Sequence, residues 1–159
     1  MAAARIEPDS FGFLIADVSR LIRAEMDRRI GEAGIGVTPG EGRALVHAMR
    51  AGPVRQNVLA ERMGLEPMTL SAYLDRLEAQ GLVERRPDPA DRRANIVHLT
   101  APAHDIIARI APVGASIRAL AAQGIDPDEW ERLSELLKIV RANLSAGKSG
   151  SVPKESAAA

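Results

Sequence analysis

Apolar residues recur at intervals of three and four along three long stretches of the chain, which is the spacing of one helical face. These stretches run from Phe11 to about Ile30, from Pro102 to about Gln123, and from Asp126 to Leu144. We therefore expect long helices toward both ends of the sequence. Pro112 interrupts the second stretch and leaves two alternatives, one kinked helix or two shorter ones.

Between the long stretches, capping and stop signals mark three shorter helices. The first begins with a capping box made by Thr38 and Glu41, with Pro39 at the first helical position. The three helices span about 38–49, 54–63 and 67–80. Gly64 closes the second, and the third begins after Glu66, which is a poor helix cap.

The last of these short helices has two unlike faces. Leu70, Leu74 and Leu77 share one face and are expected in the core. The rest of its surface is short, mixed and mostly uncharged, with Met68, Thr69, Ser71, Ala72, Asp75 and Arg76. After it, the β-rich runs 82–86 and 94–99 flank a turn-forming "PDPAD", which predicts a two-stranded hairpin. The fold class is therefore mainly α with a small β-hairpin (α+β).

The apolar stripes of the terminal helices exceed what a central unit of about 50 residues could cover, so we expect the chain to pair as a homodimer. The residues expected at that interface are Phe11, Leu14, Ile106, Ile110, Ile117, Trp130, Leu133 and Leu137. The predicted organisation is an N-terminal arm (1–9), a dimerisation helix (10–36), a central domain (37–100), C-terminal dimerisation helices (101–145) and a flexible tail (146–159).

Composition narrows the possible functions. The 159 residues include 21 basic and 21 acidic residues and no cysteine. A net charge of zero argues against binding of nucleic acid through a bulk positive field. The absence of cysteine excludes disulfides, thiolate nucleophiles and thiol oxidation switches. There is no apolar run of membrane-spanning length, and the N-terminal residues lack the pattern of a secretion signal, so a cytoplasmic location is expected.

No catalytic or metal-binding pattern emerges from the sequence. His47, His98 and His104 belong to different predicted elements and have no carboxylate cluster at ligand spacing, so we expect no metal and no cofactor. No nucleophile elbow, phosphate-binding glycine loop or carboxylate pair can be assembled either. The chain is therefore not expected to be an enzyme.

The stretch from Val58 to Thr100 resembles the winged helix-turn-helix core of the MarR (multiple antibiotic resistance) family of transcriptional regulators. The resemblance rests on a Leu-Ala-x-x-Met-Gly turn, a Leu-x-x-x-Leu-x-x-Leu-Glu helix followed by Gly-Leu-Val, and a hairpin signature. That signature consists of Asp91, Arg93, Leu99 and Thr100. The flanking helices agree in order and length, so the resemblance extends over roughly 10–144.

The resemblance implies a homodimer on double-stranded DNA, with one helix of each protomer in successive major grooves of a pseudo-palindromic operator. Base contacts would come from Met68, Thr69, Ser71 and Ala72. Phosphate contacts would come from Arg55, Gln56, Arg76, Arg86 and Arg92. The hairpin, or wing, would place Arg93 in the minor groove with Asp91 orienting its guanidinium, the alternative being an ion pair that only stabilises the hairpin. Seven arginines and seven acids balance within 54–100, so binding would depend on placement.

The resemblance also implies a regulatory ligand, a small phenolic or lipophilic acid held between the dimer helices and the DNA-binding lobe. Candidate lining residues are Phe11, Phe13, Met26, His47 and Met49, each of which has packed core as its alternative. The function expected on this basis is a transcriptional repressor relieved by such a ligand. The alternative is a winged-helix protein-interaction module that does not bind DNA.

Overall fold

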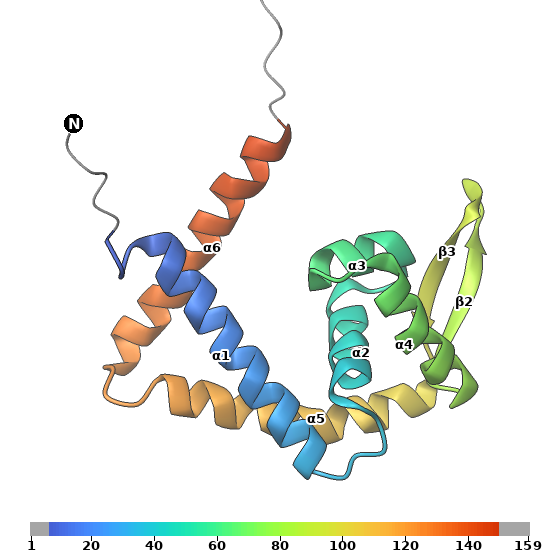
Figure 1. Ribbon diagram of the computed structural model, residues 1–159, viewed down its shortest axis with the longest axis horizontal. Coiled ribbons are helices and arrows are strands. Elements are labelled where there is room, and N and C mark those ends of the chain that lie inside the picture. The colour runs from blue at the N-terminus through green and yellow to red at the C-terminus, as the bar shows by residue number, and fades with distance from the viewer. Residues whose placement is uncertain (1–6, 150–159) are drawn as a thin grey trace, which may run out of the picture. The chain divides into compact units, whose positions relative to one another are not determined.

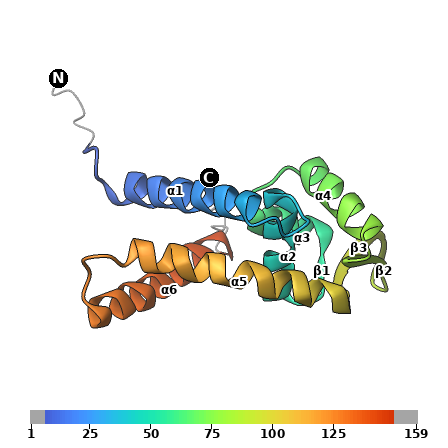
Figure 2. The ribbon, with the colours of Figure 1, turned by 90° about the horizontal axis from the view of Figure 1, so that it is seen from below.

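The computed structural model describes residues 7–149. The chain forms two compact units, with the boundary after Ile117. In chain order the elements are α1 (Phe11–Glu32), α2 (Pro39–Ala51), β1 (Val54–Arg55), α3 (Gln56–Met63), α4 (Pro67–Ala79), β2 (Val83–Asp88), β3 (Asp91–Leu99), α5 (Ala101–Ala121) and α6 (Pro127–Ser149). Figures 1 and 2 show that α4 and the β2–β3 hairpin lie together at one end of the first unit. The predicted fold class is confirmed.

The long helices differ from the prediction in two details. Pro112 lies inside α5, which continues through it as one helix. The alternative of two shorter helices is therefore wrong. Helix α6 continues to Ser149, so residues 146–149 are helical where a flexible tail was expected. The remainder of that predicted tail, and most of the predicted N-terminal arm, lie outside the described residues.

Local side-chain chemistry starts α2 where the sequence predicts. The Thr38 hydroxyl accepts a hydrogen bond from the Glu41 amide at 3.3 Å, and the Glu41 carboxylate accepts one from the Thr38 amide at 2.9 Å. Both halves of the capping box are therefore formed, with Pro39 at the first helical position. This reciprocal cap fixes the first turn of α2, which lies against α4.

The sheet has three strands in the order β1-β3-β2, all antiparallel, where the sequence predicted two. The added strand is β1, whose Val54 and Arg55 pair with Val97 and Ile96. The sequence reasoning had assigned these two residues to the start of a helix. The hairpin strands also extend further toward the turn than expected, since Asp88 pairs with Asp91 and only two residues connect them.

The core of the winged-helix lobe gathers apolar residues from α2, α3, α4, the sheet and the start of α5. Its centre is formed by Leu45, Leu59, Leu70, Leu74 and Leu77, each at most 1% exposed. As predicted, the three leucines of α4 face inward. The outward orientation of Met68 and Thr69, at the start of α4, follows from the burial of these leucines.

A second, smaller core joins α1 to α5. Ile30, Ile35 and Ile110 are buried there, and Ile106 packs against both this core and the first. Ile110 is only 2% exposed within a single chain, and Ile117 is buried as well. These α5 residues, predicted at a dimer interface, therefore contribute to the packing of one chain, and we do not retain them in the proposed interface.

Most of α1 is not covered within the chain. Its large apolar side chains from Phe11 to Ile22 are each 42–57% exposed, and Ile30 is its only buried residue. In the second unit, α6 has no buried side chain among residues 127–147, although Trp130 is half-buried and Leu133 and Leu137 are about 40% exposed. No helix within residues 7–149 combines the length and apolarity needed to cross a membrane.

Candidate nucleic-acid interface

Helices α3 and α4 form a helix-turn-helix. Gly64, between them, has the left-handed conformation (φ 64°, ψ 36°) that a residue with a side chain rarely adopts, and its amide bonds to the carbonyls of Ala60 and Glu61. The buried face of α4 leaves the start of the helix pointing outward. Met68 is 85% exposed, Thr69 is exposed, and Ser71 and Ala72 are half-buried.

A polar groove of about 370 Å³ separates this helix pair from the wing. Gln56 and Asn57 line it from the start of α3, Pro67 from the start of α4, and Asp91 and Arg93 from the wing, together with Ala94 and Asn95. The residues preceding the two helices, Arg55 and Glu66, provide no side-chain cap. The Thr69 amide instead donates to the carbonyl of Glu66 at 3.0 Å, and the Val58 amide donates to Oδ1 of Asn57 at 2.9 Å. The groove therefore offers a ligand its lining side chains.

The wing is fixed at its turn by Asp88, a buried carboxylate that the sequence reasoning treated only as a turn former. One oxygen of Asp88 accepts a hydrogen bond from the Ala90 amide at 2.9 Å, and the other accepts one from Nε of Arg55 at 2.5 Å. The Ala90 amide lowers the pKa of Asp88, and the contact with Arg55 lowers it further against the effect of burial. The turn is therefore tied to the residue that precedes α3.

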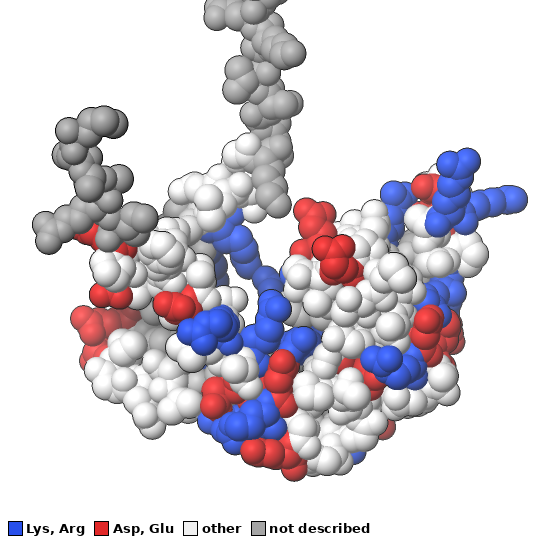
Figure 3. Space-filling model, in the orientation of Figure 1, with Lys and Arg blue, Asp and Glu red and all other residues white. Residues whose placement is uncertain are grey.

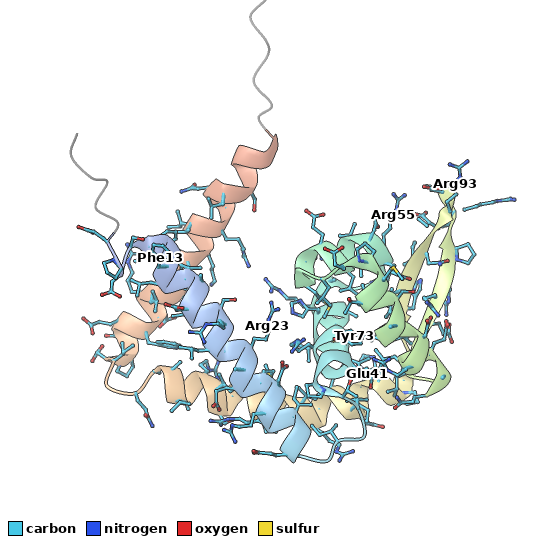
Figure 4. The ribbon with its side chains drawn as sticks, viewed as in Figure 1. Phe13, Arg23, Glu41, Arg55, Tyr73 and Arg93 are labelled. Carbon is cyan, nitrogen blue, oxygen red and sulfur yellow. The ribbon has the colours of Figure 1, made fainter. Side chains whose placement is uncertain are left out.

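Arg92 and Arg93 are exposed at the wing tip, and neither has a carboxylate partner among residues 7–149. Figure 3 shows basic side chains gathered at this tip, and Figure 4 shows Arg93 extending from it. The carboxylate of Asp91 accepts a hydrogen bond from the backbone amide of Arg93 at 3.0 Å. Asp91 therefore holds the backbone of the turn, whereas the expectation was that it would orient the guanidinium.

The other predicted phosphate contacts have partners inside the chain, with one exception. Arg55 is paired with Asp88, Arg86 with Glu84 at 2.6 Å, and Arg76 with Glu41 at 2.5 Å. The exception is Gln56, which lines the polar groove. Sequence reasoning treated these arginines as free because their partners, apart from Glu84, lie more than 30 residues away along the chain.

A separate pocket of about 300 Å³ lies among α1, α2, α3 and α5 of the first unit. Of the predicted ligand residues, Met26 and His47 line this pocket, and Phe11, Phe13 and Met49 do not. Its charged lining comes from Arg23, Arg43 and Arg62, of which Arg43 is ion-paired with Asp27 of α1. Burial, and then the nearby Arg50, Arg43 and Arg23, lower the pKa of His47. The pocket is therefore positively charged around a neutral imidazole.

Met49, another predicted ligand residue, lines a different pocket of about 210 Å³ with His98 and His104. The structure thus brings together two histidines that the sequence placed in separate elements. Within the described part of the chain, no group of three or more His, Cys, Asp or Glu side chains could hold a metal ion.

A helix-turn-helix followed by a β-hairpin defines the winged helix-turn-helix class of DNA-binding proteins. A model of the MarR family matches residues 35–94, from before α2 into β3. A relative from Bacillus subtilis (strain 168), named as the uncharacterized HTH-type transcriptional regulator YkoM, is 32% identical over 103 residues, which cover 65% of this chain and 67% of YkoM.

Solved structures agree with this class. The transcriptional regulator PA3341 is 36% identical, covers 86% of this chain and 98% of its own, and has a TM-score of 0.68. Bordetella bronchiseptica BpsR, whose DNA binding is regulated by 6-hydroxynicotinic acid, shares the fold at 20% identity and a TM-score of 0.66, covering 87% and 98% of the two chains.

The chain belongs to the MarR family of transcriptional regulators. This confirms the resemblance drawn from residues 58–100, and with it DNA binding through a helix-turn-helix. YkoM and PA3341 are both named as transcriptional regulators.

Proposed function

We propose that the protein is a homodimeric, sequence-specific repressor that binds a pseudo-palindromic operator and leaves it when a small organic acid binds. The observation that carries this proposal is the groove between the starts of α3 and α4 and the arginine-tipped wing. A helix pair on one side of a groove and a wing on the other fit a duplex whose backbone passes between them. The helix then enters the major groove and the wing the adjacent minor groove.

The start of α4 supplies the base contacts in this proposal. Met68 and Thr69 are fully available there, and the half-buried Ser71 and Ala72 lie on the next part of the same surface. A thioether and small side chains suit thymine methyl groups, and the hydroxyl groups accept or donate at base edges. Because most of these side chains are small, α4 can approach the floor of a major groove.

The groove and the wing supply the backbone and minor-groove contacts. Gln56, at the start of α3, favours a phosphate in the groove through its side-chain amide. The guanidinium groups of Arg92 and Arg93 have no ion pair among the described residues, so Arg93 can enter a narrow minor groove, where the negative potential is strongest. Arg55 and Arg86 remain proposed phosphate contacts only through guanidinium nitrogens that their carboxylate partners do not occupy. Arg76, which is paired with Glu41 and lies over the Tyr73 ring, is not retained as a phosphate contact.

The exposed apolar face of α1 supports the dimer. Phe11, Leu14, Val18 and Leu21 are each about half exposed, and exposing so many large apolar side chains in water is unfavourable. We propose that a second copy of the chain covers this face, together with Trp130, Leu133 and Leu137 of α6. Two α4 helices held by one dimer would then meet half-sites about one DNA turn apart.

The arginine-lined pocket supports regulation by an organic acid. Arg23, Arg43 and Arg62 suit a carboxylate or phenolate, while Met26 and Ile110 suit its apolar ring. A bound anion would compete with Asp27 for Arg43, and this contact joins α1 to α2 of the DNA-binding lobe. Ligand binding would thereby change the position of the DNA-binding lobe on the dimer helices. Release from the operator requires such a change.

Selection of duplexes from a random pool tests the DNA-binding part of the proposal. We expect the wild-type protein to enrich a sequence with two inverted half-sites, and Arg93→Ala to lose roughly tenfold or more of the affinity for it. Arg86→Ala, which removes an arginine already paired with Glu84, is the matched control and should lose less. An intact dimer that enriches no duplex would favour the protein-interaction module instead.

A panel of aromatic carboxylates tests release. A carboxylate that binds the pocket should weaken binding to the selected duplex, and Arg43→Ala should weaken that response without abolishing DNA binding. A response unchanged in Arg43→Ala would place the ligand elsewhere.

A further inference from the structure

Glu41 is a buried carboxylate that contacts two parts of the lobe at once. Its side chain is 2% exposed. One oxygen accepts the hydrogen bond from the Thr38 amide that starts α2, and the other accepts a bond from Nε of Arg76 on α4 at 2.5 Å. Burial alone would raise the pKa of Glu41, but the bonds from Arg76 and Thr38 outweigh burial and lower the pKa, so the carboxylate is ionised at neutral pH.

A second contact joins the same two turns. The guanidinium carbon of Arg76 lies 5.5 Å from the centre of the Tyr73 ring, which orients the guanidinium over the aromatic face. The Tyr73 ring in turn packs so closely on Gly40 that a Cβ at that position would overlap it. Gly40 and Glu41 are neighbours on α2, and Tyr73 and Arg76 lie about one turn apart on α4. The start of α2 therefore contacts α4 at two adjacent points, Tyr73 and Arg76.

The other contacts of α4 are apolar packing and, on its exposed side, the ion pairs of Asp75 and Glu78 with Arg85 of β2. Leu70, Leu74 and Leu77 bury the helix in the core, and apolar burial has little directionality. Hydrogen bonds to a buried carboxylate do depend on direction and distance. The leucines therefore set which face of α4 is buried, and the contact with Glu41 adds a directional restraint on the rotation of the helix and on its position along its axis.

The place of Glu41 in the lobe separates it from the proposed DNA contacts. Figure 4 shows Glu41 and Tyr73 together, toward the opposite end of the lobe from Arg55 and Arg93. Glu41 is also an acid, which would repel a phosphate. An effect of Glu41 on DNA binding must therefore act through the helix that it holds.

We propose that Glu41 is a positioning residue for DNA recognition, which acts through Arg76 to set the orientation of α4 and thereby the placement of Met68 and Thr69 against base edges. This inference rests on the proposed function of α4 as the helix that contacts bases. It assigns Arg76 a structural partner inside the protein in place of a DNA phosphate. Loss of the contact should then reduce discrimination between sequences more than affinity for DNA in general.

The test measures two quantities per folded protein, the ratio of affinities for the selected duplex and a scrambled duplex, and the dependence of affinity on salt. Glu41→Gln keeps an oxygen for the Thr38 amide but removes the charge that holds Arg76. We expect the affinity ratio to fall roughly tenfold, comparable to the loss of one good base contact, while the salt slope stays the same. Arg76→Met should give the same change, and the double variant no further loss.

Thr38→Val is the matched control for stability alone. It removes the hydroxyl that caps the Glu41 amide but leaves Glu41 and Arg76 paired. We expect it to lower the melting temperature and leave the affinity ratio unchanged. An unchanged ratio in Glu41→Gln, or an equal fall in Thr38→Val, would overturn the inference.

Arg76→Met keeps the inference testable if Glu41→Gln folds poorly, because Arg76 is about half exposed. A salt slope that falls by about one per protomer in Arg76→Met would instead identify a phosphate contact and also overturn the inference. A wild-type protein that prefers no duplex would overturn the proposed function itself, whereas a selective wild type with an equally selective Glu41→Gln overturns only the role of Glu41.

Discussion

At the scale of single residues, one carboxylate holds the turn of the wing. Asp88 accepts hydrogen bonds from the Ala90 amide and from Arg55, and a methyl group could accept neither. Asp88→Ala should therefore lower the melting temperature by roughly 3–6 °C, because the Ala90 amide and the Arg55 guanidinium lose their partner. The measurement is a thermal melt of the dimer at a fixed protein concentration.

Glu84→Gln serves as the control for this prediction. It removes the partner of Arg86 in an exposed ion pair, and such pairs contribute little to stability. Its melting temperature should stay close to that of the wild type. If the two variants melt alike, Asp88 has no special role in holding the wing.

His47 should give the protein a pH dependence near neutrality. Since burial lowers its pKa in the folded state, the unfolded chain binds a proton more readily and stability decreases as pH falls below about 6.5. The buried Glu41 acts in a lower range, because a carboxylate with a lowered pKa loses its contribution only below its unfolded value, near 4.5. Urea unfolding of the wild type and His47→Gln at several pH values separates the contributions of His47 and Glu41. If the free energy of unfolding depends on pH above pH 5 in the same way in both proteins, His47 is not the source of that dependence.

The sequence predicted which side chains of α4 are exposed better than it predicted the partners of the arginines. Exposure of Met68 and Thr69 follows from the period of Leu70, Leu74 and Leu77, which is a local property. The partners of Arg55 and Arg76 could not be predicted in this way, since each pairing forms only when distant elements meet. Nothing in the local pattern distinguishes a paired arginine from a free one.

At the scale of elements, the sequence predicted the helix ends that depend on capping residues. It did not predict the strand that depends on pairing with a distant strand. The capping box at Thr38 and the glycine at position 64 act within a few residues, so α2 and α3 begin or end as expected. Strand β1 has only two residues and exists because Val54 and Arg55 pair with β3, some 40 residues later. No periodicity can appear in two residues.

The contact between α2 and α4 gives a prediction at this scale. Gly40→Ala should destabilise the protein by about 1–3 kcal/mol, because the new methyl group would overlap the Tyr73 ring. Tyr73→Leu removes that ring, so the double variant should be more stable than the sum of the two single effects predicts. Denaturant unfolding measures all three variants.

Gly114→Ala is the control for the Gly40 prediction. Gly114 also lies inside a helix, but a Cβ there meets no atom within 4 Å. Because alanine is the better helix former, this change should be neutral or stabilising. Additive effects of Gly40→Ala and Tyr73→Leu would mean that the close approach does not hold α4.

At the scale of the whole molecule, the proposed dimer depends on the apolar face of α1. Leu21 is 54% exposed within one chain, so Leu21→Asp should leave the lobe folded while placing a charge in the interface. We expect monomers in sedimentation and a loss of roughly a hundredfold in affinity for the selected duplex, because two linked contacts become one. Arg20→Glu, an exposed neighbour on another face of α1, should remain dimeric.

The α5 residues call for the opposite expectation. Ile110 is buried against Ile30 and Ile35 within one chain, so a charge there should unfold the chain before it separates protomers. A dimeric Leu21→Asp protein that binds DNA normally would contradict the proposed interface.

The most direct test of the account is the ratio of dissociation constants for the selected duplex and for a scrambled duplex of the same composition, measured at one salt concentration near 0.15 M. A formal net charge of zero leaves little general attraction to DNA, so binding must come from placed contacts. We predict that the dimer binds the selected duplex roughly a thousandfold more tightly than the scrambled one. Equal affinities for the two duplexes would contradict the account.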